Sequence, residues 1–413
     1  MINLIIPPSP YLKNDRVFVS LGILYVASVL EKNGYRVKVT DLKGSKDWQT
    51  RIIEATHADT EFFGITSVTP DFPITLQIFK TIKSVNKNTP VIIGGAHAIV
   101  APEQCSMFDK VVSGDGTTGI LLALGNSKEK VIRPPLTMNL DELPFPSRHL
   151  IDLKTYNYDI NGRKATNVMS QFGCPFSCVF CCGRNIPFYR KVRFRSPKNF
   201  VEELDQLNKD YGYGAFMIHD DEFNLDKART LQLCGLMEKR NYIFRGFVRT
   251  DLFTEEIAKA MAKAGFYEVD VGIESGSMRI LKLLNKHTSP EINSRARKLA
   301  AKYGMKFKAF VTVGHPSESR EDIALTKEWL IENSPDAFEV YMVTPYPGAP
   351  IFDQKDKYDI EFSIDYSRDD TAVTRSYGQH KCLVRNSNLS EQELALLREE
   401  LDKQVREKLG LLS

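Results

Sequence analysis

Four of the seven cysteines of this chain lie within nine positions, in the stretch SQFGCPFSCVFCCGRN. The spacing is Cys174-x-x-x-Cys178-x-x-Cys181, and Cys182 follows the third thiol directly. A structural zinc site takes four ligands, often as two separated pairs, and no second Cys or His pair occurs nearby. Three thiolates on one loop instead suit three corners of an iron–sulfur cube, with one iron left open for a substrate or cofactor. The spacing favours an iron–sulfur site, with zinc as the alternative.

Further polar residues come at the ends of strand-like segments downstream of the cysteines. The ends of parallel strands meet at one edge of an α/β barrel, where such barrels place their chemistry. Each of these residues also has an ordinary structural explanation. An acid can cap the next helix, Arg249 can pair with the carboxylate of Glu274, and a tyrosine can pack in the core. The candidates are Asp220, Asp221, Arg249, Glu274, Ser275 and Tyr346.

The elements that would position these residues form a series of strands and helices over residues 164–348. Six strand-like segments alternate with helical patterns, whereas a closed barrel needs eight units. We therefore predict a partial (β/α)6 TIM barrel. Residues 349–413 are predicted to be a C-terminal extension that ends in a helix over 389–410. The expected strands are 166–172, 215–221, 243–249, 267–274, 306–314 and 337–345.

The first 125 residues show a separate α/β pattern of five strands with helical crossovers. This alternation predicts a flavodoxin-like (Rossmann-type) doubly wound domain, in which ligands bind outside the carboxyl ends of the strands. Residues 126–163 are rich in proline and are predicted to be a linker. The small or polar residues expected to line the ligand crevice are Ser67, Gly94, Gly95, His97, Gly114 and Gly116.

The composition is that of an ordinary globular protein of 413 residues, with 42% hydrophobic and 26% charged residues. A net charge of +3 is too small to indicate a nucleic-acid partner. We find no apolar run near the ~20 residues that span a bilayer and no signal peptide, so we expect no membrane partner. Clustered thiols outside a disulfide framework fit a reducing compartment, which predicts a cytoplasmic protein.

The cysteine spacing, directly after the first strand of a six-unit partial barrel, resembles that of the radical S-adenosylmethionine (SAM) enzymes. The resemblance implies a [4Fe-4S] cluster on Cys174, Cys178 and Cys181 that binds SAM at its open iron. It further implies reductive cleavage of SAM to methionine and a 5′-deoxyadenosyl radical, with electrons from a donor such as flavodoxin or ferredoxin. By the same resemblance Asp220 and Asp221 would hold the SAM ammonium. The remaining candidates would contact other parts of SAM or, for Tyr346, relay a radical or a proton; they are Arg249, Glu274, Ser275 and Tyr346.

An α/β domain of this pattern immediately before such a barrel looks like the cobalamin-binding subgroup of the same family. The supporting segments are PPSP, VIIGGAHAIVAPE and DKVVSGDGTTGILLAL. The chain lacks the D-x-H-x-x-G motif that supplies a lower histidine ligand, so the resemblance implies cobalamin bound without one. It leaves open a domain that has lost the cofactor. His97 would touch the corrin amides or merely cap a helix.

The resemblance implies an enzyme, and we expect a cobalamin-dependent methyltransferase acting on carbon or phosphorus of a small metabolite, natural-product intermediate or peptide. The alternatives are a radical SAM enzyme with a non-methylating reaction and a non-catalytic iron–sulfur electron-transfer or binding protein. The substrate and the oligomeric state cannot be read from the sequence. The region after the barrel could be a substrate lid that uses Arg375, Tyr377 or His380, or an ordinary surface loop.

Overall fold

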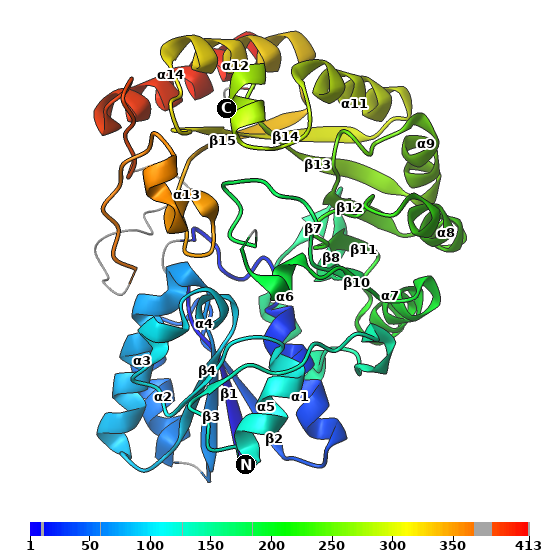
Figure 1. Ribbon diagram of the computed structural model, residues 1–413. Helices are drawn as coiled ribbons and strands as arrows, with labels where there is room; N and C mark the ends of the chain where they lie inside the picture. Colours follow the sequence, from blue (N-terminus) through cyan, green and yellow to red (C-terminus); the bar gives the residue numbers. More distant parts are fainter. Residues whose placement is uncertain (10–11, 58, 126, 184, 367–381, 412–413) are drawn as a thin grey trace. The chain divides into compact units, whose positions relative to one another are not determined.

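The computed structural model describes residues 1–413 except 10–11, 58, 126, 184, 367–381 and 412–413. The chain divides into two compact units (Figure 1). The first contains Met1–Asn157 and Ile364–Gly378, and the second contains Tyr158–Ser363 and Gln379–Ser413. The lid candidates Arg375, Tyr377 and His380 lie outside the described residues.

The first unit is built on a parallel sheet with the strand order β2-β1-β3-β4-β5-β6. The first five strands follow the flavodoxin-like order that the sequence predicts, with the topological switch between β1 and β3. The short sixth strand lies in the expected linker and pairs with β5, so the chain up to Asn157 belongs to this unit. The strands are β1 (Ile2–Ile6), β2 (Val37–Asp41), β3 (Phe62–Thr66), β4 (Val91–Gly94), β5 (Lys110–Val112) and β6 (Val131–Ile132).

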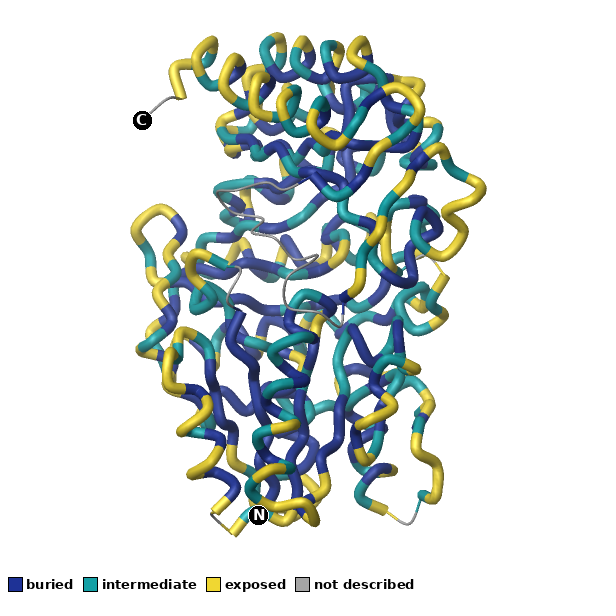
Figure 2. The backbone as a smooth tube through the Cα atoms, turned by 90° about the vertical axis from the view of Figure 1, so that its left-hand side faces the viewer, coloured by how far each residue is buried: buried dark blue, intermediate teal, exposed yellow. Residues whose placement is uncertain are grey.

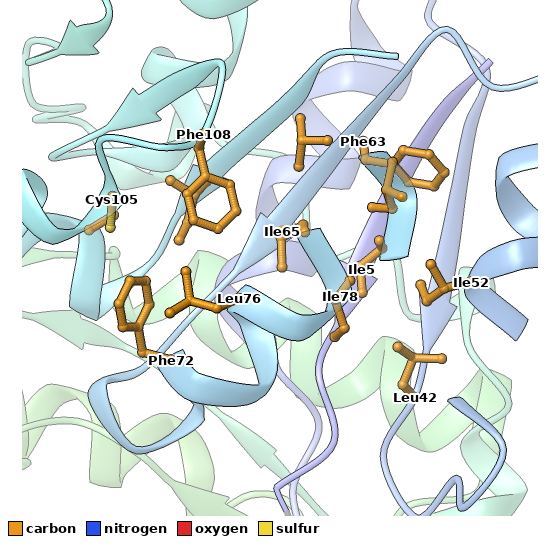
Figure 3. Close-up of a cluster of buried hydrophobic side chains, with 14 of the residues drawn as sticks. Ile5, Leu42, Ile52, Phe63, Ile65, Phe72, Leu76, Ile78, Cys105 and Phe108 are labelled. Atoms are coloured by element: carbon orange, nitrogen blue, oxygen red, sulfur yellow. The ribbon is translucent and has the colours of Figure 1, made fainter. Parts of the chain in front are cut away.

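Helices cover both faces of this sheet. Helices α2 and α3 lie on one side and α1 and α5 on the other (Figure 1). Ile5 and Ile65 of the sheet pack with Ile52 of α2 and Ile78 of α3 (Figure 3). Each fully buried side chain of this size contributes about 1.5–3 kcal/mol. The helices are α1 (Leu21–Lys32), α2 (Trp48–His57), α3 (Phe72–Val85), α4 (Ala96–Val100) and α5 (Gly116–Leu124).

The second unit is built on a sheet with the order β15-β14-β13-β12-β11-β8-β7. Strands β8 to β15 of this sheet are parallel, and β7 pairs antiparallel with β8 at the edge. Six parallel strands form the open, partial barrel that the sequence predicts. A separate antiparallel pair, β9 (Gln171–Phe172) and β10 (Arg193–Phe194), flanks the cysteine loop. The main strands are β7 (Asp159–Ile160), β8 (Arg163–Val168), β11 (Ala215–Ile218), β12 (Ile243–Phe247), β13 (Phe266–Glu274), β14 (Lys306–Val313) and β15 (Ala337–Met342).

Helices line the outer side of the barrel sheet (Figure 1). In β14, Phe307 and Val311 are buried, whereas the alternate residues Phe310 and Thr312 are only half-buried. This period of two leaves one sheet face less tightly covered than the other. Figure 2 shows that buried residues lie along the strands and that exposed residues lie on the outer turns of the helices. The helices are α6 (Pro187–Arg190), α7 (Pro197–Tyr211), α8 (Lys227–Met237), α9 (Glu255–Ala264), α10 (Met278–Leu283), α11 (Pro290–Lys302), α12 (Arg320–Asn333), α13 (Pro350–Asp353) and α14 (Glu391–Leu409).

The last helix, α14, packs against α12 and β15. It begins with a capping box between Ser390 and Glu393, and its buried stripe contains Leu394, Leu401 and Val405. The apolar stripe therefore packs on the barrel unit. Within the described residues, no helix is both long enough and apolar enough to cross a bilayer.

Candidate active site

The cysteine loop follows β9, and segments outside the loop fix its backbone. The amide of Cys174 donates to the carbonyl of Tyr189 at 2.8 Å. Farther along, the amide of Val179 donates to the carbonyl of Leu284 at 3.0 Å. These bonds tie both halves of the loop to neighbouring structure. The thiols are therefore presented by a loop whose backbone is anchored at two points.

The four thiols of the loop differ in environment. Burial raises the pKa of Cys174 to about 12 and also raises the pKa of Cys178. A hydrogen bond between neighbouring thiols raises the pKa of Cys181 and lowers that of Cys182. All four are free of disulfides. Among the described residues, no group of three or more His, Cys, Asp or Glu side chains is arranged to hold a metal ion. The fit of an iron–sulfur cluster therefore rests on the donor set and on the fixed loop.

Gly173 makes the tight turn that leads into the first of these cysteines. Its φ is +87°, and an added Cβ would lie 2.4 Å from the carbonyl oxygen of Lys191. In the structure it allows the chain to pass close to the backbone beside β10, which sets the direction of the loop.

Asp220 was expected to contact the SAM ammonium, but its carboxylate faces the backbone of the protein. It is buried, and its Oδ1 accepts hydrogen bonds from the amides of Ser170 at 2.6 Å and Gln171 at 3.0 Å. Its Oδ2 accepts from the hydroxyl of Ser170. Both oxygens thus accept hydrogen bonds inside the protein, so the structure does not place Asp220 to contact SAM. Asp220 instead anchors the segment that carries the cysteine loop to the end of β11.

A pocket of about 260 Å³ lies at the carboxyl ends of β12 and β13. Three expected residues meet there: Asp221, Arg249 and Glu274. Two charged residues that the sequence did not single out, Glu222 and Lys286, line it as well. The complete lining is Asp221, Glu222, Phe247, Val248, Arg249, Thr250, Asp251, Asp270, Gly272, Glu274, Lys286, Thr288 and Phe310.

Two adjacent carboxyl groups of this pocket hold protons more tightly than usual. Loss of solvent raises the pKa of Asp221 to about 6, and the nearby charge of Asp220 adds to the effect. Loss of solvent likewise raises the pKa of Glu222 to about 7, although Lys286 and Arg249 oppose the shift. Asp221 is exposed at the pocket and Glu222 is half-buried, so a cationic ligand that entered the pocket would meet both acids and favour their charged forms.

Arg249 pairs with a carboxylate, but not with the expected one. Its guanidinium donates to Asp251 through two bonds of 2.9 and 3.0 Å, and it donates to the carbonyl of Lys286 at 2.7 Å. Glu274 pairs instead with the Lys286 ammonium at 3.0 Å. The expected Arg249–Glu274 pair is therefore absent. Two separate ion pairs line the pocket in its place.

Ser275 and Tyr346 stand outside the lining of this pocket. Ser275 is buried, where its hydroxyl meets that of Thr326 at 3.2 Å and accepts from the amide of Ser277 at 3.1 Å. It shapes the turn after β13, so the structure does not place it to contact a cofactor. Tyr346 is half-buried, and burial raises its pKa to about 12, with a smaller contribution from Cys182. Tyr346 thus belongs to the surroundings of the cysteine loop.

The turn after β14 contains a fully buried acid that the sequence did not single out. The Oε2 atom of Glu318 accepts from the amides of Gly314 at 2.6 Å and His315 at 3.2 Å. Burial raises the pKa of Glu318 to about 8 and lowers that of His315 to about 4. The imidazole bonds the hydroxyl of Thr312 at 2.7 Å. These buried groups hold the shape of the turn.

In the first unit, the expected crevice residues gather at the carboxyl ends of β3, β4 and β5. The amide of Ser67 donates to the carbonyl of Gly94 at 3.0 Å. At Gly95, φ is +91° and an added Cβ would lie 2.7 Å from the Ser67 carbonyl oxygen, so the two strand ends approach closely. Gly114 and Gly116 flank the N-cap of α5.

Two observations test whether this edge suits a corrin. Val68, the second residue after β3, is 42% exposed, and Met138, which follows the residue whose amide donates to the α5 N-cap Asp115, is 53% exposed. Exposed apolar side chains beside small residues suit a large ring with an apolar face. The residues present therefore fit a cobalamin.

His97 does not reach the surface of this crevice. It is fully buried, its Nδ1 lies 3.3 Å from the Thr69 hydroxyl, and its ring centroid lies 3.9 Å from that of Phe72. Burial lowers its pKa to about 4, so it is neutral at pH 7. The expected contact with corrin amides is replaced by an internal role at the start of α4.

Comparison with known proteins decides the family. Residues 168–330 match the model of the radical SAM superfamily, and residues 15–122 match that of the B12 binding domain. An uncharacterised methyltransferase of Pyrococcus horikoshii is 30% identical over 359 residues, which is 81% of this chain and 77% of that protein. The chain belongs to the radical SAM superfamily. Its first unit carries the B12-binding domain, and its second carries the radical SAM barrel.

Two further comparisons extend over most of the chain. The anaerobic magnesium-protoporphyrin IX monomethyl ester cyclase of Cereibacter sphaeroides is 24% identical over 84% of this chain and 61% of the cyclase. The chain thus spans less than two thirds of that relative. The solved structure of the radical SAM methyltransferase TsrM from Kitasatospora setae, with cobalamin and a [4Fe-4S] cluster bound, gives a TM-score of 0.72 at 17% identity. It covers 91% of this chain and 82% of TsrM, and it shows a common fold.

Family membership confirms the predicted cofactors of the second unit, a [4Fe-4S] cluster and SAM, and the B12-binding domain supports cobalamin in the first. Zinc is no longer needed to explain the cysteines. Cys174, Cys178 and Cys181 are the residues that would hold the cluster. The charges of the pocket suit SAM, which carries an ammonium, a sulfonium and a carboxylate: the acids are Asp221 and Glu222, and the cations are Arg249 and Lys286.

Proposed function

We propose that this radical SAM enzyme is a cobalamin-dependent methyltransferase that acts on a small molecule. The observation that carries the proposal is the union in one chain of a B12-binding domain and a radical SAM barrel, in a sequence 30% identical to a methyltransferase over 81% of its length. When bound, the cluster and SAM supply a 5′-deoxyadenosyl radical, and cobalamin supplies a transferable methyl group. This combination suits methylation of an unactivated carbon or of phosphorus.

In this proposal the pocket at the ends of β12 and β13 holds SAM. Asp221 and Glu222 accept hydrogen bonds from its ammonium, and this positive charge would favour the charged forms of the two acids. Lys286 and Arg249 face the same space and suit the carboxylate. Phe247 and Phe310, with ring centroids 6.2 Å apart, form an apolar wall beside these charges.

The first unit would hold cobalamin through backbone and apolar contacts and without a histidine ligand. The loop after β1 contains no histidine, and His97 is buried. Ser67, Gly94, Gly95, Gly114 and Gly116 remain the proposed cofactor-contacting residues. A low-potential electron donor of the flavodoxin or ferredoxin kind and a cytoplasmic location complete the proposal.

A second candidate function is a non-methylating radical reaction, such as a cyclisation. The likeness to the protoporphyrin ester cyclase, over 84% of this chain, favours it. The two candidates share the cluster, SAM and the barrel pocket. They differ in the fate of the methyl group of SAM.

The distinguishing experiment follows a deuterated methyl group. The chain is loaded with cluster and cobalamin, reduced, and incubated with SAM that carries a CD3 group. Deuterium in the cobalamin fraction, together with 5′-deoxyadenosine, supports methyl transfer. 5′-Deoxyadenosine without label in cobalamin supports the non-methylating reaction. If neither labelled cobalamin nor 5′-deoxyadenosine forms, both candidate functions are contradicted. The matched control is Cys178→Ala, which should form no 5′-deoxyadenosine.

A further inference from the structure

Two cations rest on the two phenylalanines of the cysteine loop. The Arg249 guanidinium carbon lies 3.5 Å from the ring centroid of Phe176, and the Lys286 Nζ lies 5.7 Å from that of Phe180. Both rings stand between cysteines of the loop. A cation over an aromatic face is attracted by the negative charge of that face, so both cations are held beside the thiols.

The two cations differ in how far their charge is compensated. Arg249 makes a bidentate pair with Asp251, which offsets most of its charge at a distance. Lys286 makes a single contact with Glu274, of 3.0 Å, and the two side chains are 13% and 10% exposed. Lys286 is thus joined to its partner by one hydrogen bond, whereas Arg249 is joined to its partner by two.

The backbone makes room for the Lys286–Glu274 pair. A Cβ on Gly272 would lie 2.4 Å from Glu274 Oε1 and 3.0 Å from Lys286 Nζ, so a larger residue would displace both groups. Glu274 itself has a φ of +64°, which an L residue adopts only at a cost, and the register of β13 against β14 shifts beside it. The backbone at Glu274 is strained and Gly272 leaves space for the pair. We infer that this ion pair has a functional role at the cysteine loop.

The charges of this pair act on the loop with opposite signs. The segment that carries Lys286 is bonded to the cysteine loop, because the Val179 amide donates to the Leu284 carbonyl at 3.0 Å and the Asn285 side-chain amide donates to the Ser177 carbonyl at 3.0 Å. Both side chains of the pair are shielded from water, so their interactions are weakly screened. A further negative charge placed on this loop would be stabilised by Lys286 and destabilised by Glu274.

We propose that Lys286 and Glu274 form a redox-tuning pair that sets the reduction potential of the cluster held by the cysteine loop. Reduction takes one electron from a low-potential one-electron donor and adds one unit of negative charge to the site, with no bond formed or broken. The Lys286 ammonium raises the potential, and the Glu274 carboxylate lowers it. The inference rests on the cluster of the proposed function but not on methyl transfer.

The test is the midpoint potential of the cluster-loaded full chain without SAM, followed by electron paramagnetic resonance. Lys286→Met should shift the potential to a more negative value, because it removes the stabilising cation. Glu274→Gln should shift it to a more positive value, and Lys286→Arg should leave it near that of the wild type. The matched control is Lys282→Met on α10, an exposed lysine four positions earlier, which should not move the potential.

Iron and sulfide content distinguish the ways in which the test can fail. A wild-type chain that binds no iron contradicts the proposed function and not the tuning alone. Fully loaded Lys286→Met with an unchanged potential overturns the tuning proposal, as does a negative shift in Glu274→Gln. If Lys286→Met loses its iron, the sign of the change in midpoint potential in Glu274→Gln decides whether the tuning proposal holds.

Discussion

Replacement of Asp220 tests whether this buried acid anchors the cysteine loop. Asp220→Ala removes the acceptor for the amides of Ser170 and Gln171. A buried donor left without a partner costs about 1–3 kcal/mol, so two such amides cost about 2–6 kcal/mol. That is a large share of the 5–15 kcal/mol that is usual for a folded domain. We expect Asp220→Ala to destabilise the second unit and to bind less iron.

Asp220→Asn is the matched control. One amide oxygen can still accept from both backbone amides, and the amide nitrogen can donate to the Ser170 hydroxyl. Burial also raises the pKa of Asp220, so a neutral group removes part of the cost of desolvating the charge. We expect the free energy of unfolding of Asp220→Asn to lie within about 1 kcal/mol of the wild type.

The assay is urea unfolding followed by tryptophan fluorescence. The chain has two tryptophans, Trp48 in the first unit and the buried Trp329 in the second. A Trp48→Phe background therefore reports on the second unit alone. Asp220→Ala with the wild-type midpoint and full iron content would refute the anchoring role. Loss of SAM affinity in a stable Asp220→Asn would instead restore the direct SAM contact that the sequence suggested.

Three further predictions concern the loop and its surroundings. Gly173→Ala should lower the iron content, because the added Cβ would overlap a backbone carbonyl. The control is Gly212→Ala, at a similar φ of +72° with nothing within 4 Å of the added Cβ. It should lower the free energy of unfolding by only about 1–2 kcal/mol and should keep its iron. Glu318 has a folded pKa of about 8 against 4.5 when unfolded, so the folded chain binds the extra proton and its stability falls as pH rises toward 8. In urea unfolding, Glu318→Gln should remove about 2 kcal/mol of the fall between pH 6.5 and 8, and an identical pH profile would contradict this. Iron and sulfide analysis should show that Cys178→Ala loses the cluster and Cys182→Ala retains it, and equal loss would mean that Cys182 is a ligand.

The fold and the location of the site follow from patterns that the sequence carries by itself. Alternating strands and helices predict the two α/β units, and the strand ends predict where polar residues meet. The cysteine spacing locates the loop. These patterns are local and periodic, so they can be recognised in the sequence without knowledge of the tertiary contacts.

The roles of single residues depend on tertiary partners that no local pattern reveals. Of three consecutive acids after β11, Asp220 turns inward to the backbone of β9, whereas Asp221 and Glu222 line the pocket. Lys286 follows a short helix and matches no motif, yet it enters the pocket to pair with Glu274. His97 reads as a crevice residue, but its ring packs inside the core.

The measurement that tests the central claim most directly is the iron, sulfide, cobalt and 5′-deoxyadenosine content of one preparation. The chain is purified without oxygen from cells supplied with cobalamin and is then given SAM and a reductant. We expect about four irons per chain, stoichiometric cobalt and 5′-deoxyadenosine that disappears in Cys178→Ala. Iron without cobalt would contradict the cobalamin-dependent account and leave the non-methylating reaction. A chain with neither iron nor 5′-deoxyadenosine would contradict the assignment of the site as a whole.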